Sequence, residues 1–148
     1  MKSDSYRLAV VGVAVVFLSI VLDGVVLGAS EKKADASVNC EIQAGACVQS
    51  LEGGRVTLEI LPRPVTAMTD LTFRVTLAGL SPEDAPGIDL GMPGMSMGPN
   101  HVTLEKTSEG VYTGTGVIVR CHSGRTLWQA DVTVPGAGKV VFTFNVVY

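Results

Sequence analysis

The chain has 148 residues, of which 47% are hydrophobic and 17% are charged, and its formal net charge at pH 7 is −3. This length accommodates one domain of ordinary size. Nucleic acid selects clustered Lys and Arg, and the mildly acidic chain has no such cluster, so composition argues against a nucleic-acid-binding protein.

The N-terminal segment, residues 1–30, predicts an export leader. Basic residues precede an uncharged apolar run over residues 8–22, which suits a signal peptide better than a membrane span of about 20 residues. Small residues at Ala29 and Ser30 favour cleavage there. Because apolar residues continue beyond the run, an uncleaved inner-membrane anchor is the alternative. In both cases we expect an exported, periplasmic domain that meets the membrane only through this segment.

Residues 31–54 are predicted to be a polar linker followed by a closely spaced pair of cysteines. Cys40 and Cys47 are the near pair, and an oxidising compartment favours a disulfide between them. This bond would pin the segment locally and leave Cys121 as the odd thiol. A redox switch at Cys40 and Cys47 is the alternative to a structural disulfide.

From residue 55 onward, apolar and polar residues alternate. The pattern is strict in RVTLEIL (55–61), LTFRVTL (71–77) and VVFTFNVVY (140–148). A period of two predicts half-buried antiparallel strands, and the Pro- and Gly-rich stretches between them supply the turns. About seven strands fit into residues 55–148, so we expect an all-β, immunoglobulin-like sandwich of two antiparallel sheets. A small Greek-key barrel is the alternative.

The stretch GMPGMSMGPNH, residues 91–101, concentrates methionine in a turn. Three of the five methionines of the chain, Met92, Met95 and Met97, lie within it. Thioether sulfur is a soft ligand that needs no deprotonation and prefers ions such as Cu(I) or Ag(I). We therefore expect a soft-metal site made by these methionines and His101. The alternatives are methionines that fill an irregular apolar gap, and an apolar surface that binds another exported protein.

The stretch VYTGTGVIVRCHSG, residues 111–124, predicts a long strand. Its alternation places Cys121 toward the core together with Val119, and His122 toward solvent. Cys121 is therefore expected to be a small buried residue, with an additional metal ligand as the alternative. Trp128 shares its parity with core-facing residues and is expected inside the sandwich.

The acidic residues form no pair with a defined spacing. No acid/base couple, nucleophilic triad or phosphate-binding loop can be assembled from the sequence. We therefore expect a protein that binds, buffers or delivers a metal ion and is not an enzyme.

Three stretches of the chain resemble the YtkA-like and FixH-like family of small exported or membrane-anchored Ig-like domains. They are LPRPVTAMTDLTFRVTL, IDLGMPGMSMGPN and GVYTGTGVIVRCHSGRTLWQADVTV, and the resemblance covers residues 55–148. The shared pattern is a Pro-containing lead, a Met-Pro-x-Met turn, a Gly-x-Tyr segment, and a Gly and a Trp before the last strands. Its positions here are Pro62, Pro64, Met92 to Met95, Gly110 to Tyr112, Gly124 and Trp128.

The resemblance implies copper handling and cytochrome oxidase assembly. We expect an exported or membrane protein as partner, in oxidase assembly or in metal efflux. This chain departs from the family pattern at its ligands. Relatives commonly carry a histidine closer to the methionine turn, and a methionine where Cys121 stands. Cys121 is therefore a candidate replacement for a lost ligand.

Overall fold

The computed structural model describes residues 37–148, and the expected leader lies outside the described residues. Between residues 37 and 148 the chain forms nine strands: β1 (Cys47–Leu51), β2 (Gly54–Leu61), β3 (Asp70–Ala78), β4 (Gly87–Gly91), β5 (His101–Thr103), β6 (Glu105–Ser108), β7 (Val111–Val117), β8 (Leu127–Val134) and β9 (Gly138–Asn145). The described residues contain no helix, which confirms the all-β prediction for this part of the chain. In the same range there is accordingly no helix that could cross a membrane.

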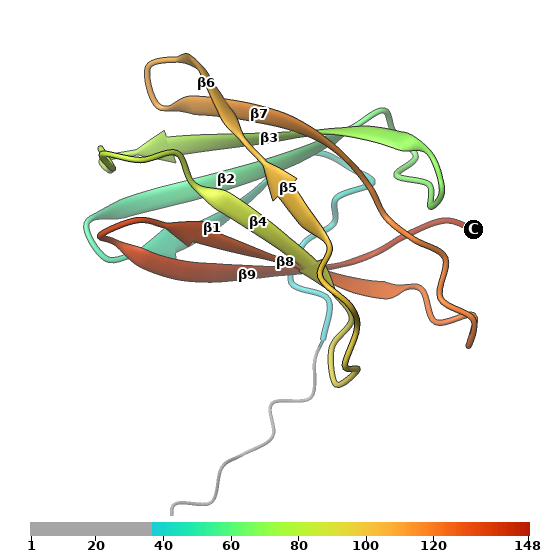
Figure 1. Cartoon of the computed structure of the whole chain (residues 1–148). Helices are drawn as coiled ribbons and strands as arrows, with labels where there is room; N and C mark the ends of the chain where they lie inside the picture. Colours follow the sequence, from blue (N-terminus) through green and yellow to red (C-terminus); the bar gives the residue numbers. More distant parts are fainter. Residues whose placement is uncertain (1–36) are drawn as a thin grey trace, which may run out of the picture. The chain divides into compact units, whose positions relative to one another are not determined.

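The strands make two antiparallel sheets that pack into a sandwich (Figure 1). The five-stranded sheet has the order β1-β2-β3-β7-β6, and the four-stranded sheet has the order β5-β4-β8-β9. The largest buried side chains between them are Trp128, Phe73, Phe142 and Phe144, all fully shielded from solvent. The predicted core position of Trp128 is therefore confirmed.

The alternation of the sequence matches the two faces of each sheet. In β3, Leu71, Phe73 and Val75 are buried, whereas Thr72 and Arg74 are exposed. This follows from the strand period of two, because successive side chains point to opposite faces. Thr143 in β9 breaks the pattern and is buried.

More strands form than the alternation predicted, and one reason is a change of sheet. The stretch HVTLEKTS contains both β5 and β6, which belong to different sheets. Leu104 lies between them and is buried. The chain therefore crosses from one sheet to the other at this residue, with a single side chain filling the crossing point.

Glycines in β7 allow the two sheets to approach each other at this crossing. A Cβ atom at Gly114 would overlap the carbonyl oxygen of Thr103 in β5. At Gly116 it would lie 2.6 Å from a methyl group of Val102, far inside van der Waals contact. The absence of side chains at these two positions lets β5 lie directly over β7.

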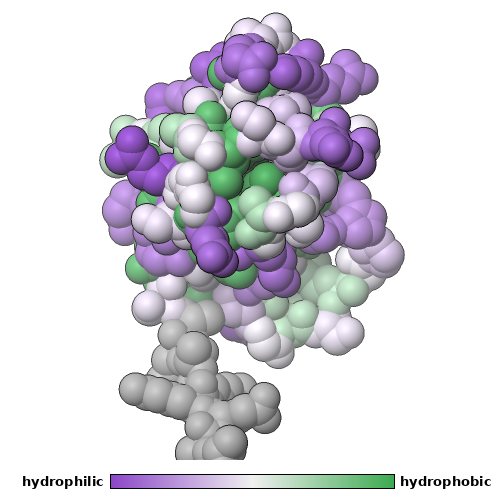
Figure 2. Space-filling model, turned by 90° about the vertical axis from the view of Figure 1, so that its left-hand side faces the viewer, coloured by the Kyte–Doolittle hydropathy of each residue, from purple (hydrophilic) through white to green (hydrophobic). Residues whose placement is uncertain are grey.

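The connections gather at the two ends of the sandwich. The β1–β2, β3–β4 and β8–β9 connections lie at the end that faces the viewer in Figure 2, where apolar surface is ringed by hydrophilic residues. The β2–β3 and β7–β8 connections lie at the other end, on the right in Figure 1, and the β4–β5 connection projects at the bottom of that view. Arg125 of the β7–β8 connection contacts Pro93 of the β4–β5 connection. The methionine turn belongs to this second end.

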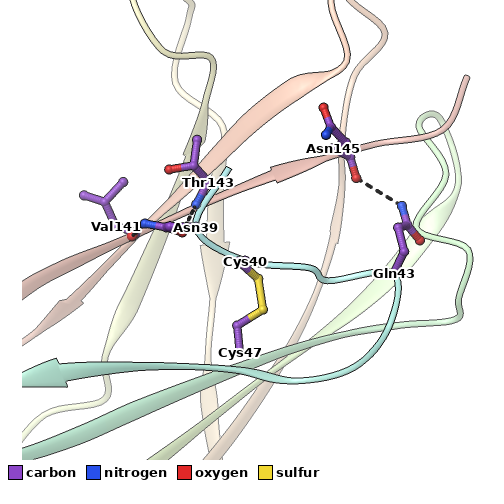
Figure 3. Close-up of a disulfide and its surroundings, with 7 residues drawn as sticks. All are labelled: Asn39, Cys40, Gln43, Cys47, Val141, Thr143 and Asn145. Carbon is purple, nitrogen blue, oxygen red and sulfur yellow. Dashed lines mark hydrogen bonds between the residues drawn. A yellow bond between two sulfur atoms is a disulfide. The ribbon is translucent and has the colours of Figure 1, made fainter. Parts of the chain in front are cut away.

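Residues 39–51 form an N-terminal strap that joins the two sheets along one side (Figure 3). At its end, β1 pairs with β2 of the five-stranded sheet. At its start, the backbone N–H of Cys40 donates to the carbonyl oxygen of Thr143 in β9 at 3.1 Å. The side chain of Asn39 accepts from the Thr143 N–H at 2.7 Å and donates to Val141 at 3.0 Å. These contacts cover Thr143, which explains why it is buried.

Cys40 and Cys47 form a disulfide within the strap, as the sequence predicted (Figure 3). Their sulfur atoms are 2.05 Å apart and their Cα atoms 5.5 Å apart. Beside them, Gln43 accepts from the Val65 N–H at 2.7 Å and donates to Asn145 at 3.0 Å. Cys40 and Ile42 are buried. The cysteine segment, which the sequence analysis predicted to precede the domain, therefore packs into the core of the domain.

Removing the disulfide should destabilise the protein measurably. The bond closes a short loop, with a sequence separation of 7 residues, and loop-closure entropy for such a loop corresponds to about 2.5 kcal/mol. We expect the double variant Cys40→Ala, Cys47→Ala to lose about that free energy of unfolding, measured by urea denaturation of the full chain. Cys121→Ala is the control and should change it little. If the double variant were as stable as the wild type, the hydrogen bonds of the strap would be sufficient to hold it in place without the disulfide.

Candidate functional site

The sequence Met-Pro-Gly-Met folds as a tight turn at the end of β4. The N–H of Met95 donates to the carbonyl oxygen of Met92 at 3.1 Å, and Gly94 has a φ of 71°. Proline at the second position and a glycine with positive φ at the third are the signature of a type II turn. The turn therefore fixes the spacing of Met92 and Met95 through the backbone.

The three methionines and His101 line one pocket, which we call the methionine pocket. Its volume is about 250 Å³. The loop that follows β4 supplies the thioethers, and the first residue of β5 supplies the imidazole. The structure thus brings together all four of the primary ligands that the sequence predicted, namely Met92, Met95, Met97 and His101.

The three thioethers differ in burial. Met92 is 3% exposed and belongs to the core, Met97 is partly buried against it, and Met95 is 36% exposed. Met92 therefore also fills apolar space, as the packing alternative expects. Met95 reaches solvent and contributes the least packing of the three.

His101 forms a contact that the sequence alone does not predict. Its Nδ1 atom pairs with the carboxylate of Asp89, which lies directly opposite in β4. Both side chains are more than half exposed. A histidine held through one ring nitrogen presents the other, here Nε2, to a ligand, and this is how carboxylates orient metal-binding histidines.

A second carboxylate, that of Asp131 in β8, lies next to Asp89 in the sheet and also lines the pocket. Asp131 is engaged by two neighbours: Lys139 donates to it at 2.9 Å and Gln129 at 3.0 Å. The hydrogen bond to Asp131 raises the pKa of Lys139. The charge of Asp131 is therefore compensated within the sheet.

Three hydrogen bonds fasten the methionine loop to the rest of the sandwich. The backbone carbonyl oxygen of Asn100 accepts from the Leu90 N–H at 2.8 Å, and the side-chain amide of Asn100 donates to the carbonyl oxygen of Val117 at 3.1 Å. From the β7–β8 connection, Arg125 donates to the carbonyl oxygen of Pro93 at 3.1 Å. The loop is thus held at its base and at its turn.

Cys121 lies apart from the methionine pocket, on a connection where the sequence predicted a continuous strand. Strand β7 ends at Val117, after which Ile118 is fully buried and Val119 is 41% exposed, the reverse of the expected faces. Cys121 itself is partly buried on the β7–β8 connection and does not line the pocket. His122 is exposed, as its position predicted. The strand ends early because the chain leaves the sheet to form this connection.

The Tyr148 hydroxyl holds this connection in place. It accepts from the indole N–H of Trp128 at 3.1 Å and from the backbone N–H of Cys121 at 3.4 Å, and it donates to the carbonyl oxygen of Arg125. The guanidinium of Arg120 lies over the tyrosine ring, 5.5 Å from its centre. The backbone around Cys121 is therefore tied to the core.

The thiol of Cys121 is expected to react at lower pH than an ordinary cysteine. The Ser123 hydroxyl lies 2.9 Å from Sγ, and this hydrogen bond, with help from backbone groups and the charge of Arg125, lowers the pKa of Cys121. We expect Ser123→Ala to move the pH dependence of iodoacetamide alkylation to higher pH. The exposed serine variant Ser108→Ala is the control. An unchanged pH profile in Ser123→Ala would contradict the role of this hydroxyl.

Sequence reasoning missed the residues that surround the predicted ligands. The pair Asp89–His101 arises from strand register, and the Arg125–Pro93 contact joins two separate loops. Within residues 37–148, no three His, Cys, Asp or Glu side chains gather as a metal-ligand group. Only the methionine turn itself left a local signal in the sequence.

The chain was compared with protein-family models, with curated proteins and with solved structures, and none of the three comparisons finds a match.

Proposed function

We propose that this protein is an exported soft-metal-binding protein that buffers or delivers Cu(I) or Ag(I) and transforms no substrate. The observation that carries the proposal is that Met92, Met95, Met97 and His101 line one pocket. Three thioethers and one imidazole form a neutral, soft ligand set that suits a monovalent soft ion. The type II turn and the loop contacts fix the backbone of this set before any ion binds, which lowers the ordering cost of binding.

The role of each ligand follows from its burial. Met92 supplies sulfur from the core side, and Met95 supplies it from the solvent side. His101, oriented by Asp89, adds a nitrogen ligand at the opening. A thioether also cannot form a disulfide in an oxidising compartment, where a free thiol pairs.

We also propose that the sandwich is immunoglobulin-like and related to the YtkA-like and FixH-like domains. The strand orders β2-β3-β7-β6 and β5-β4-β8-β9 correspond to the orders A-B-E-D and C′-C-F-G of immunoglobulin domains. Strand β1 is then an addition at the edge. From the resemblance to these domains, and not from the strand order, we propose a partner in oxidase assembly or metal efflux. An N-terminal leader or anchor would bring the protein to it in the periplasm or at the membrane.

A second candidate function is a non-catalytic interaction module. The same end of the sandwich exposes apolar side chains from separate segments besides Met95. Met68 on the β2–β3 connection is 66% exposed, and Val147 in the C-terminal segment, which bridges to Thr66, is 44% exposed. Exposed apolar side chains on neighbouring loops suit a protein partner. In this function the methionines provide apolar contact area for the partner, and their sulfur atoms bind no metal.

An anaerobic titration of the protein with Cu(I), followed through the methionine methyl signals by NMR, separates the two functions. We expect stoichiometric shifts confined to Met92, Met95 and Met97. The methyl group of Met68 is an internal control, because Met68 does not line the methionine pocket. If none of the three methyl signals moves, the soft-metal function is wrong and a protein partner should be sought.

A further inference from the structure

The end of the sandwich opposite the methionine pocket has a larger hollow, which we call the distal pocket. Its volume is about 530 Å³, within the range of small-molecule sites. The β1–β2, β3–β4 and β8–β9 connections surround it, and Figure 2 looks onto it. Leu80, Val134 and Ala137 are among the apolar residues that line it.

Close contacts between the three connections form the distal pocket in advance of any ligand. Leu80 packs on the β1–β2 turn, where a Cβ at Gly54 would lie 2.8 Å from the Leu80 side chain. Leu51 packs on the start of β9, 3.5 Å from the Cβ position of Gly138. Each connection therefore supports its neighbour, and the hollow does not depend on a ligand to hold it open.

Acidic side chains stand around the apolar surface of the distal pocket. Glu52, Glu83 and Asp84 all line it and all are exposed. None of them joins an ion pair within residues 37–148. Among the described residues, no Lys, Arg or His side chain lines it. The distal pocket thus combines an apolar wall with uncompensated negative charge.

We propose that the distal pocket binds a small organic cation with an aliphatic stem, of the primary alkylammonium class. The stem lies against Leu80, Pro135 and Ala137, which are partly exposed, and the ammonium group faces the carboxylates of Glu52, Glu83 and Asp84. A bare metal ion would leave the apolar wall unused, and an anion would meet repulsion. The volume and the three surrounding connections favour a compact ligand over an extended peptide. This site is independent of the soft-metal function.

The test uses ¹⁵N-labelled protein purified from cells that express the full chain. It is titrated separately with hexylammonium, hexan-1-ol and hexanoate, which share the stem and differ in charge. We expect hexylammonium to shift the backbone signals of Leu80 and Ala137 in a saturable way, hexan-1-ol to bind more weakly and hexanoate not to bind. From butylammonium to hexylammonium, affinity should rise about fourfold per methylene group.

Charge and shape are tested by separate variants. Neutralising the rim with E52Q, E83Q and D84N should weaken hexylammonium binding about tenfold, since exposed charge pairs contribute modestly. The matched control neutralises Glu41, Glu105 and Glu109, which are exposed and do not line the distal pocket, and should bind like the wild type. Ala137→Leu fills the hollow and should abolish binding of both hexylammonium and hexan-1-ol.

Several results would overturn the proposal. Equal affinities for hexan-1-ol and hexylammonium would show that the carboxylates do not contribute to binding. Displacement of hexylammonium by CaCl2 with the same shifts would make the site an inorganic cation site. Tighter binding of a lysine-containing peptide than of the free amine would assign it to a protein partner. Absence of any saturable shift would rule out a site.

Discussion

Met95→Leu is expected to weaken Cu(I) binding about 100-fold, because loss of a direct ligand should cost at least as much as loss of an outer contact to a metal site. Leucine keeps the apolar volume and removes the sulfur atom. Met95 is 36% exposed, so its contribution to packing is small and the folded state should persist. Exchanges between Met and Leu usually cost less than about 1.5 kcal/mol even in a core.

The affinity can be measured by competition with a chromophoric Cu(I) chelator under anaerobic conditions. Met68→Leu is the matched control, because it removes one thioether at the same end of the sandwich but outside the methionine pocket. This control should bind Cu(I) like the wild type. If Met95→Leu also binds like the wild type, the sulfur of Met95 is no ligand, and the interaction-module function becomes the better explanation.

Gly114→Ala is expected to destabilise the fold by about 3 kcal/mol, at the upper end of the usual cost of overpacking. The new methyl group would meet the carbonyl oxygen of Thr103, a backbone atom of β5 that cannot rotate away. β5 is itself paired with β4, so relief requires movement of the four-stranded sheet. For a domain of this size, the loss corresponds to a fall in Tm of about 15 °C.

Thermal unfolding of the full chain, followed by circular dichroism in the far ultraviolet, measures this loss. Gly87→Ala is the control, because Gly87 also lies in a strand but has no atom within 4 Å of its Cβ position. Its Tm should change little. A Tm of Gly114→Ala close to that of the wild type would show that β5 can move away from β7 at little cost.

The strands that the sequence predicted correctly are those whose two faces meet different surroundings. In β2 and β3, apolar side chains enter the core and polar ones meet solvent, so alternation is visible along the chain. The stretch HVTLEKTS carries the same signal, and only the structure reveals that it serves two sheets. Alternation reports which face is buried and contains no information about which sheet a strand joins.

The part of the candidate site that neighbouring residues encode was predictable, and the contacts between residues distant in the sequence were not. Proline and glycine between Met92 and Met95 predict a turn, because proline fixes φ at its own position and glycine allows the positive φ that the next position needs. The partner of His101 depends on the register between β4 and β5, which no residue nearby encodes. The expected faces of Ile118 and Val119 were wrong because the prediction assumed that the strand continued, whereas β7 ends at Val117.

The N-terminal strap has a consequence for the behaviour of the chain before oxidation. Strand β9 is the edge of its sheet, and a free edge is a template for pairing with another chain. Asn39 and Cys40 occupy the hydrogen-bonding groups of Thr143 on that edge. Because the disulfide closes the strap, we expect a chain that has not yet oxidised to leave part of this edge open more often. Formation of the disulfide should then also protect the protein against edge-to-edge aggregation.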